Sequence, residues 1–498
     1  MATSVDDPPD DTTVGPSGGP NRLRVLGATV LRFLGRAHGL FLLVGGVFLT
    51  IFVAMVPPGW GLDEQTHFYR AYQLSEGTLI PSRDPATGTF LYAVPRSVYD
   101  LLQKGWADAN EVDRGSPSYH RQDMPNPSRY PELEAAPLNP DDRVSADLTQ
   151  TMANVPVVYA ASAAAMALAR AFGADVGTLV LAAKIANALV YLGLAFLAIW
   201  FARRLRFRWL LLVTALLPAA IFQASVITAD TFTNGVCLLF LSVAGTLILE
   251  RRPVGGRVLA LLAASAAAVA LSKPTYALLV GIVAVIPAAV FPSRRWGRWF
   301  KAAVLLGALV LLAGTLFLGQ KGAVGVYAQR GDVASAISAP DQLVFVVTHP
   351  VESVLVLGRT IEVYGQTWLQ GVVGLFGYNT VPVPTPFVVL LVLALVAAGF
   401  YSERLRPVAG WVVLLAGCLV GLALVGVFYL TFTPVGDAAV DGIQGRYFIP
   451  CVVAVTIGAA GILPVRVAMR AGTARIGFTA VSTLSLAAAA LMYHLYLY

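Results

Sequence analysis

The sequence predicts an all-α polytopic membrane protein with about eleven transmembrane helices. Of its 498 residues, 57% are hydrophobic and only 13% are charged. Soluble proteins average about 25% charged residues, so this chain has too little polar surface to cover a soluble globule. Its apolar runs are also long enough to cross a bilayer, which takes about 20 residues, and short basic clusters separate them.

This composition argues against a water-soluble enzyme, a disordered scaffold and a nucleic-acid-binding domain. The net charge is +7, but the basic residues lie in short clusters between apolar runs. They do not form a stripe interleaved with aromatic residues, so we expect no nucleic-acid partner. The cysteines Cys237, Cys418 and Cys451 all lie in apolar runs and lack the spacing of a metal site or a disulfide framework.

The N-terminal segment 1–38 is predicted to be a disordered and basic cytoplasmic tail. It begins with a stretch rich in Pro, Asp, Gly, Ser and Thr, and several arginines follow. The next apolar run, 39–57, has the length of a signal-peptide core or of a span, but no small-x-small cleavage site follows it. We therefore interpret this run as a signal anchor that leaves the N-terminus in the cytoplasm.

The distribution of arginine decides the status of the ambiguous apolar stretch 152–172. If this stretch lies flat on the outer surface, every short basic loop falls on the cytoplasmic side, as the positive-inside rule requires. If it crossed the membrane, the same loops would face outward. The flat arrangement also makes the C-terminus extracytoplasmic. The predicted spans are 39–57, 178–201, 209–228, 230–249, 257–272, 274–292, 300–319, 384–401, 408–430, 447–464 and 474–497.

Two long outer loops divide the predicted chain. The first, 58–177, belongs to a transmembrane module that covers 39–319, and it holds most of the acidic residues outside the N-terminal tail. The second, 320–383, precedes the C-terminal transmembrane helices of 384–498. Long outer loops with carboxylates beside short basic cytoplasmic loops indicate that the functional site lies on the outer face.

The first outer loop opens with PPGWGLDEQTHFYRAYQLSEG, in which Asp63 and Glu64 follow the first span. Adjacent carboxylates at a membrane surface can act as a general base or bind a divalent cation, although no cofactor follows with certainty. The alternative is structural, with Asp63 capping a helix that begins at Glu64. His67 lies one turn further on and is a weaker candidate for substrate binding, because packed or solvated histidines are commoner.

Three more charged residues lie in or beside apolar segments. Asp230 is a lone carboxylate at a turn, and an ionisable residue at membrane depth is a functional candidate; its alternative is a helix cap. Lys273, in LSKPTYA, is the one basic residue of an otherwise uncharged outer hairpin. Lys184 lies near the outer end of the second span. Each lysine could bind phosphate as a point charge or simply snorkel to the interface.

The fourth candidate segment is DAAVDGIQGRYFIP, where Gln444, Arg446 and Tyr447 lie at the outer boundary of a span. An arginine there can clamp a phosphate, or it can anchor the helix at the interface together with its aromatic neighbour. Fixed cations could hold a lipid phosphate, and carboxylates could activate an acceptor hydroxyl. The common outer position of all these residues favours transfer of a sugar from a lipid-phosphate carrier.

Five segments of the chain resemble the bacterial membrane proteins grouped as domain-of-unknown-function family 2142. They are PPGWGLDEQTHFYRAYQLSEG, SVITAD, LSKPTYA, GVVGLFGYNTVPVP and IQGRYFIP, in that order. The resemblance covers essentially the whole chain after residue 39, and DExxHF and QGRYFxP are its most specific parts. It implies a multi-pass protein of the bacterial plasma membrane.

That family in turn resembles the GT-C superfamily of integral membrane glycosyltransferases, which use polyprenyl-phosphate sugars as donors. The resemblance implies a large first outer loop with juxtamembrane helices. It makes Asp63 or Glu64 the general base or a metal ligand, and Asp230 the second acidic position. The lone Asp230 departs from the paired acidic motif of the metal-dependent oligosaccharyltransferases, which leaves metal dependence open. The implied lipid-phosphate contacts are Lys184, Lys273 and Arg446.

The expected function is transfer of a sugar from a polyprenyl-phosphate donor to a cell-envelope glycan or lipid acceptor on the outer face. Asp63 or Glu64 would deprotonate the acceptor, and the sugar would be transferred in a single displacement with inversion. Membrane lipid would surround the protein. The alternatives are a transporter or flippase of lipid-linked precursors and a non-catalytic subunit of an envelope assembly. The sequence shows no internal repeat with matched broken helices, which is typical of transporters.

Overall fold

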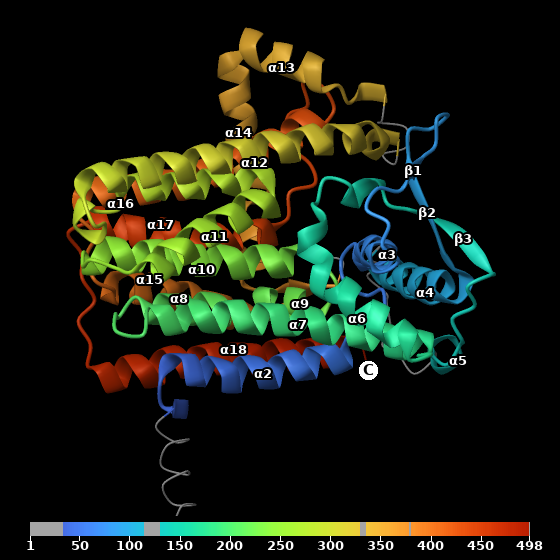
Figure 1. The fold of residues 1–498 in the computed structure, drawn as a ribbon, viewed down its shortest axis with the longest axis horizontal. Helices are drawn as coiled ribbons and strands as arrows, with labels where there is room; N and C mark the ends of the chain where they lie inside the picture. Colours follow the sequence, from blue (N-terminus) through green and yellow to red (C-terminus); the bar gives the residue numbers. More distant parts are fainter. Residues whose placement is uncertain (1–32, 114–129, 329–334, 378–379, 498) are drawn as a thin grey trace, which may run out of the picture.

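The structure is a computed structural model, and it describes residues 33–113, 130–328, 335–377 and 380–497. Most of the described chain is helical, and most of the long helices are aligned along one direction (Figure 1). Three short strands and several short helices lie together at one end of this helical layer. Most of the predicted disordered tail, 1–32, lies outside the described residues.

Seven helices in the described chain are long and apolar enough to cross a membrane. Two pairs of helices pass the same test together but are bent at short breaks, by 56° between α8 and α9 and by 109° between α13 and α14. The seven are α2 (Ala37–Met55), α7 (Val176–Phe201), α10 (Ala229–Glu250), α12 (Arg294–Ala328), α16 (Pro407–Thr431), η8 (Gly445–Phe448) continued by α17 (Ile449–Ile462), and α18 (Ala471–Leu497). The bent pairs are α8 (Arg208–Ala215) with α9 (Pro218–Ser225), and α13 (Ala339–Thr348) with α14 (Pro350–Val373).

The prediction of eleven spans is therefore not confirmed, because the described chain has seven to nine candidates. Three predicted spans correspond to helices of only 17, 12 and 17 residues. A helix of 17 residues is about 26 Å long, slightly short of the roughly 30 Å of a hydrocarbon core. These helices are α11 (Gly256–Ser272), η5 (Pro274–Val285) with the short η6 (Ala288–Val290), and α15 (Thr385–Tyr401).

The segment between α2 and α7, predicted as the first outer loop, folds into a small unit with its own sheet. Strand β2 lies between β1 and β3 in an antiparallel sheet. The prediction of an all-α chain is wrong for this unit, because short half-buried strands carry a much weaker sequence pattern than apolar helices do. Its elements are α3 (Glu64–Ser75), β1 (Ser82–Arg83), β2 (Phe90–Pro95), α4 (Arg96–Asp113), α5 (Pro131–Glu134), β3 (Arg143–Asp147) and η3 (Thr149–Thr151).

Both segments that we predicted to lie outside the membrane contain apolar helices. The stretch 152–172 forms η4 (Pro156–Tyr159) and α6 (Ala160–Ala171), and α6 has only 12 residues, about 18 Å. The predicted loop 320–383 contains the bent pair of α13 and α14 and a two-stranded sheet. The strands of that sheet are β4 (Leu375–Phe376) and β5 (Val381–Pro382).

Basic turns between the long helices meet at the end of the molecule where α2 begins. Glu403, before α16, accepts hydrogen bonds from the backbone N–H groups of Arg206 at 2.7 Å and Phe207 at 3.1 Å. Arg404 donates to the Gly461 carbonyl at 3.3 Å, which joins the α15–α16 turn to the end of α17. The α7–α8 turn, the α15–α16 turn and the end of α17 therefore lie together at one end of the helical layer.

Helices α2 and α18 lie side by side and begin at this same end (Figure 1). Near their other ends, the rings of Phe52 and Tyr493 lie 6.3 Å apart, and Phe222 of α9 lies 5.4 Å from Tyr493. Both helices therefore cross the layer in the same direction.

Close glycine contacts bring the C-terminal helices together. A Cβ atom on Gly458 of α17 would lie 2.5 Å from the backbone nitrogen of Leu414 in α16. One on Gly461 would lie 3.0 Å from the Cα of Gly410. In an apolar environment, small residues that allow backbones to approach are a main source of helix association. The glycines of these runs are thus part of the packing that positions the start of α17, where the candidate site lies.

Candidate functional site

Four charged side chains from four segments form one cluster, which we call the carboxylate–cation cluster: Asp63, Asp230, Lys273 and Arg446. Lys273 donates to one carboxylate oxygen of Asp230, and Arg446 Nε lies 3.2 Å from the other. Arg446 also approaches Asp63, with 3.5 Å between its terminal nitrogen and a carboxylate oxygen. Arg446 therefore links two carboxylates that are far apart in the sequence.

Asp230 is the buried centre of this cluster. It lies in the first turn of α10, and only 6% of its side chain is exposed. The helix cap is supplied by Thr228, whose side chain accepts from the Asp230 N–H at 3.3 Å. The alternative of a capping role for Asp230 is thus excluded by the observed geometry. Its carboxylate is instead used to bind two cations.

Arg446 is held by the close packing of the η8 turn. A Cβ atom on Gly445 would lie 2.1 Å from the carbonyl oxygen of Trp368 and 2.7 Å from the Cα of Gly371 in α14. Only glycine fits there, which explains the glycine of the QGRYF segment. The guanidinium also donates to Gln223 of α9 at 3.3 Å. The Arg446 side chain is only 7% exposed, so its position is well defined.

Asp63 is the accessible carboxylate of the cluster, with 37% of its side chain exposed. It has a positive φ of 58°, which is uncommon for a residue other than glycine, although Asp adopts it more readily than most. Its side chain makes no capping hydrogen bond to α3. Burial raises the pKa of Asp63 above its usual range, while the charge of Arg446 opposes that rise. A partly exposed carboxylate with a raised pKa is well suited to accept a proton.

Glu64 points away from this cluster and into a second, fully buried pair. Its two oxygens accept from the backbone N–H groups of Gly61 at 3.0 Å and of Ile227 at 3.2 Å. Lys184 lies 3.8 Å from Glu64 and donates to the Val56 carbonyl at 2.8 Å. Both side chains are 3% exposed or less. Glu64 and Lys184 therefore join the end of α2 to the α9–α10 turn, and the structure does not bring Lys184 to the cluster.

His67 is one turn along α3 from Asp63 and has a specific partner. Its Nδ1 lies 2.6 Å from the hydroxyl of Tyr159, which also accepts from Asn154 at 3.1 Å. Burial lowers the pKa of His67 to about 3, and the positive charges of Lys273 and Arg446 add to that effect. His67 is consequently a neutral imidazole at physiological pH, able to donate or accept a hydrogen bond without carrying charge.

Gln444 and Tyr447 complete the η8 side of the site. The Lys273 ammonium lies 4.6 Å from the centre of the Tyr447 ring, within range of a cation–π interaction. The Tyr447 carbonyl accepts from the hydroxyl of Tyr276 at 2.8 Å, which ties η8 to η5. The side-chain oxygen of Gln444 is buried without a hydrogen-bond partner among the described residues. Both predicted residues thus lie beside the cluster, on the same turn as Arg446.

Two residues of this site were not predicted. Gln223 is the only amide in the apolar run that forms α8 and α9, and that isolation was the available signal. Tyr159 has no comparable signal, because tyrosines are common near membrane interfaces. Only the packing of η4 against α3 brings it to His67.

The cation that links the two carboxylates of the cluster is the guanidinium of Arg446. Within the described ranges, no group of three or more His, Cys, Asp or Glu side chains could hold a metal ion. Asp63 and Asp230 both lie against Arg446 instead. The arrangement can therefore fix an anionic group between Lys273 and Arg446 and present Asp63 to a hydroxyl beside it.

Comparisons with known proteins agree with the resemblance of the sequence motifs. No curated protein matches the chain, and no solved structure matches it. The profile of a family described as predicted membrane protein (DUF2142) matches residues 46–455, which include all four residues of the carboxylate–cation cluster. The predicted family membership is confirmed: the chain belongs to the DUF2142 family of multi-pass membrane proteins.

Proposed function

We propose that this protein is a membrane glycosyltransferase that transfers a sugar from a polyprenyl-phosphate donor to a cell-envelope glycan or lipid acceptor. The observation that carries the proposal is the convergence of Lys273, Arg446 and Asp63 around Asp230. Two cations in fixed positions suit a phosphate, and the carboxylate beside them suits a hydroxyl nucleophile. Sugar transfer from a lipid phosphate needs both groups together.

In the proposed reaction the donor phosphate is held by Lys273 and Arg446. Asp63 takes the proton of an acceptor hydroxyl, and the acceptor oxygen attacks the anomeric carbon as the bond from that carbon to the phosphate oxygen breaks. The electron pair of the broken bond stays on the polyprenyl phosphate, whose charge the two cations stabilise. One displacement of this kind inverts the configuration of the anomeric carbon.

The geometry favours Asp63 over Glu64 as the base. Both oxygens of Glu64 accept backbone hydrogen bonds, and its side chain is 1% exposed. The Asp63 carboxylate is partly exposed, and among the described residues its side-chain partner is Arg446. In this proposal Asp230 holds the two cations in place, and the neutral His67 is available to bind a sugar hydroxyl. The reaction is written without a metal ion.

We further propose that the bent pair of α8 and α9 and the short helices α11, η5 and α15 also cross the membrane, and that the bent pair of α13 and α14 does not, which gives the eleven spans and a GT-C-like arrangement. The N-terminus would then be cytoplasmic, the C-terminus extracytoplasmic, and the cluster on the outer face of the bacterial plasma membrane. The basic turns at the opposite end of the layer support this orientation. Cysteine accessibility at residue 84 and at residue 295 in intact cells would test it, since only the first should react with an impermeant reagent.

The test of the function is a transfer assay with the full chain reconstituted in lipid. Radiolabelled polyprenyl-phosphate sugars and a cell-envelope extract are supplied to wild type, Asp63→Asn and the control Asp142→Asn, which changes an exposed carboxylate paired with Arg96. We expect Asp63→Asn to lower the rate about 10²- to 10⁴-fold, the usual contribution of a general base. The control should retain the wild-type rate.

Two results would contradict the proposal. Full activity in Asp63→Asn would remove Asp63 as the base. No transfer by wild type with a broad panel of donors would favour a carrier or flippase of lipid-linked precursors, or a non-catalytic subunit, in which the cations bind the lipid phosphate without chemistry at the sugar.

A further inference from the structure

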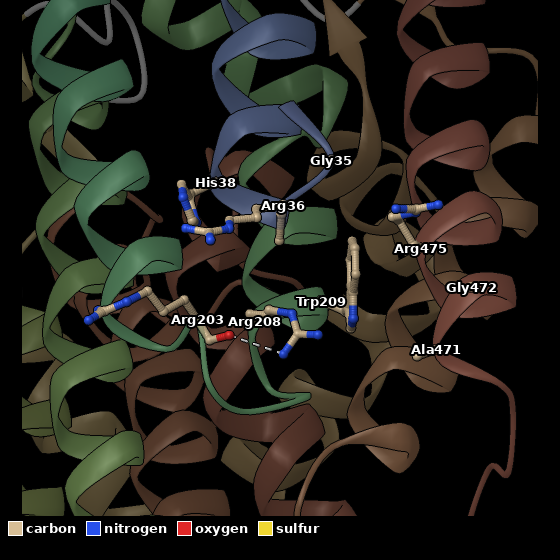
Figure 2. Close-up of a pocket in the computed structure, with 10 residues that line it drawn as sticks. Gly35, Arg36, His38, Arg203, Arg208, Trp209, Ala471, Gly472 and Arg475 are labelled. Carbon is tan, nitrogen blue, oxygen red and sulfur yellow. Dashed lines mark hydrogen bonds between the residues drawn. The ribbon is translucent and has the colours of Figure 1, made fainter. Parts of the chain in front are cut away.

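A cavity of about 550 Å³ lies at the end of the molecule opposite the carboxylate–cation cluster. It is lined by residues at the starts of α2, α8 and α18 and by the turn between α7 and α8 (Figure 2). We call it the arginine cavity, because four arginines line it. Its principal side chains are Arg36, Arg203, Arg208, Arg475, His38 and Trp209.

The charge of this cavity is uncompensated within its own lining. All of its lining residues belong to the described chain, and none of them is Asp or Glu. Among the described residues, the Arg36 and Arg475 side chains make no hydrogen bond or ion pair. Glu403 acts on Arg208 electrostatically, but its oxygens accept from the backbone of the α7–α8 turn. The cavity therefore concentrates positive charge that an anion could neutralise.

Two residues of the cavity lining carry a buried nitrogen that has no hydrogen-bond partner among the described residues. His38 and Trp209 are both 3% exposed, and within the described structure Nδ1 of His38 and Nε1 of Trp209 make no hydrogen bond. An unsatisfied buried polar group costs about 1–3 kcal/mol, so such groups normally have a partner. The indole N–H is a donor only, and it requires an acceptor. Both residues belong to the lining of the same cavity as the arginines, which makes an anion bound there a candidate partner for these nitrogens.

Three helix N-termini also meet here. Helices α2, α8 and α18 begin at Ala37, Arg208 and Ala471, and all three residues line the cavity. The first N–H groups of α8 already donate to the carbonyls of Leu205 and Arg206, so the N–H groups for an anion would come from α2 and α18. The first backbone N–H groups of a helix lack intrahelical acceptors, and the helix dipole favours negative charge at that end. Phosphate groups bind at such positions for both reasons.

We propose that the arginine cavity binds a phosphate-bearing anion. Guanidinium groups match the geometry of phosphate oxygens, while the indole and imidazole nitrogens and the helix N-termini supply neutral contacts. The anion belongs to a membrane lipid headgroup or to a soluble phosphate compound. The lipid source is supported by exposed apolar residues that continue from the cavity along its two long helices, such as Leu43 on α2 and Ile476 on α18. This inference is independent of the proposed transfer reaction, which takes place at the opposite end of the molecule.

The site is tested by measuring which anions bind the purified full chain in detergent. Native mass spectrometry compares dioleoylphosphatidylglycerol, which is anionic, with dioleoylphosphatidylcholine, which is neutral overall. A calorimetric titration with inorganic pyrophosphate tests the soluble source. We expect one of the two anions to bind at a single saturable site. Binding of the lipid alone assigns a headgroup site, and binding of pyrophosphate alone assigns a soluble ligand.

Matched variants distinguish binding in the arginine cavity from non-specific attraction of anions to the basic surface. Arg36→Gln/Arg475→Gln removes two cavity charges, and Arg295→Gln/Arg298→Gln removes two exposed arginines at the start of α12. We expect the first double variant to weaken binding about ten-fold or more and the second less than about two-fold. Trp209→Phe, which keeps the aromatic ring and loses the N–H, should weaken binding about five-fold.

Three outcomes would overturn the proposal. In the first, the wild-type protein does not bind pyrophosphate and shows no preference for phosphatidylglycerol over phosphatidylcholine. Another is equal weakening in the two arginine double variants, which would indicate non-specific attraction. The third is unchanged affinity in both the cavity variant and Trp209→Phe when each has the wild-type melting temperature.

Discussion

The two ends of α2 carry groups of cations whose surroundings differ. At the end where α2 stops, Lys273 and Arg446 are paired with Asp230, and Arg446 also contacts Asp63. The start of α2 lies about 28 Å away along this 19-residue helix, and there the described residues that line the arginine cavity include no carboxylate. In the proposed reaction the paired cations are held in fixed positions for a bound phosphate, whereas the arginines of the cavity have no carboxylate among the described lining residues. The same residue types therefore form a charge-balanced site at one end and a net positive cavity at the other.

The largest effect should come from removing the carboxylate that fixes the paired cations. Asp230→Asn leaves two cations without their buried partner, and we expect it to lower the free energy of unfolding by about 3–5 kcal/mol. Adding Lys273→Met should recover part of this loss, because one of the stranded charges is removed. Equilibrium unfolding of the full chain in mixed micelles measures both variants. If Asp230→Asn is as stable as wild type, the cluster is not a coupled unit.

The adjacent carboxylates Asp63 and Glu64 should respond in opposite ways. Glu64→Gln loses its charge interaction with Lys184 and strains two backbone hydrogen bonds, so we expect unfolding to be easier by about 1–3 kcal/mol, with transfer activity per folded molecule retained. Asp63→Asn should change stability by less than about 0.5 kcal/mol, because Asn also tolerates a positive φ, and should lower the transfer rate about 10²- to 10⁴-fold. Parallel unfolding and transfer measurements make the comparison. Loss of activity in the folded Glu64 variant alone would reverse the assignment of the base.

His67 should make stability depend on pH below neutrality. Its pKa is lowered from 6.5 to about 3 by burial, so the unfolded chain binds a proton more readily than the folded chain. The resulting stability is present above pH 6.5 and is lost as the pH falls toward 3; between pH 7.5 and 5.5 the loss is about 1.4 kcal/mol. His67→Gln should lack this part of the pH dependence. Identical profiles for the two proteins would show that His67 is already accessible to protons.

The smallest effect is expected at the arginine cavity without any added anion. Arg475→Gln removes an exposed charge without a counterion, so we expect a change of less than about 0.5 kcal/mol and a slight gain in stability from reduced repulsion. The melting temperature in lipid-free detergent measures it. A loss of several degrees would mean that Arg475 already has a structural partner, and the contrast between the two ends would not hold.

The positions of the helices could largely be predicted from the sequence, because an apolar run long enough to cross a membrane has few possible structures other than a helix. Each predicted span coincides with an apolar helix or a bent pair of helices, although three of these helices are short by length alone. The sheet formed by β1, β2 and β3 was not predicted. Strand β3 is separated from its partner β2 by α4 and α5, and pairing between strands so far apart in the chain has no local sequence signature.

The sequence predicted the charged residues of the carboxylate–cation cluster as candidates, but it did not predict which of them contact one another. A lone Asp230 in an apolar run, and Arg446 beside a glycine and an aromatic residue, are noticeable in the sequence. Nothing local distinguishes Asp63 from Glu64, since both follow the same span. The distinction comes from the turn before α10, whose Ile227 N–H binds Glu64 and leaves Asp63 to Arg446.

The sequence by itself determined that this chain enters a membrane, which of its loops are basic, and which few charged residues lie near apolar segments. Hydrophobic runs and charge counts are local properties, and transfer free energy depends on them directly. The tertiary structure decided which charges meet. It paired Lys273 and Arg446 with Asp230 and placed Lys184 beside Glu64. It also gathered four arginines around a cavity whose described lining residues include no carboxylate. Ion pairing depends on distances between segments that lie far apart in the chain, and only the packing of the helices sets those distances.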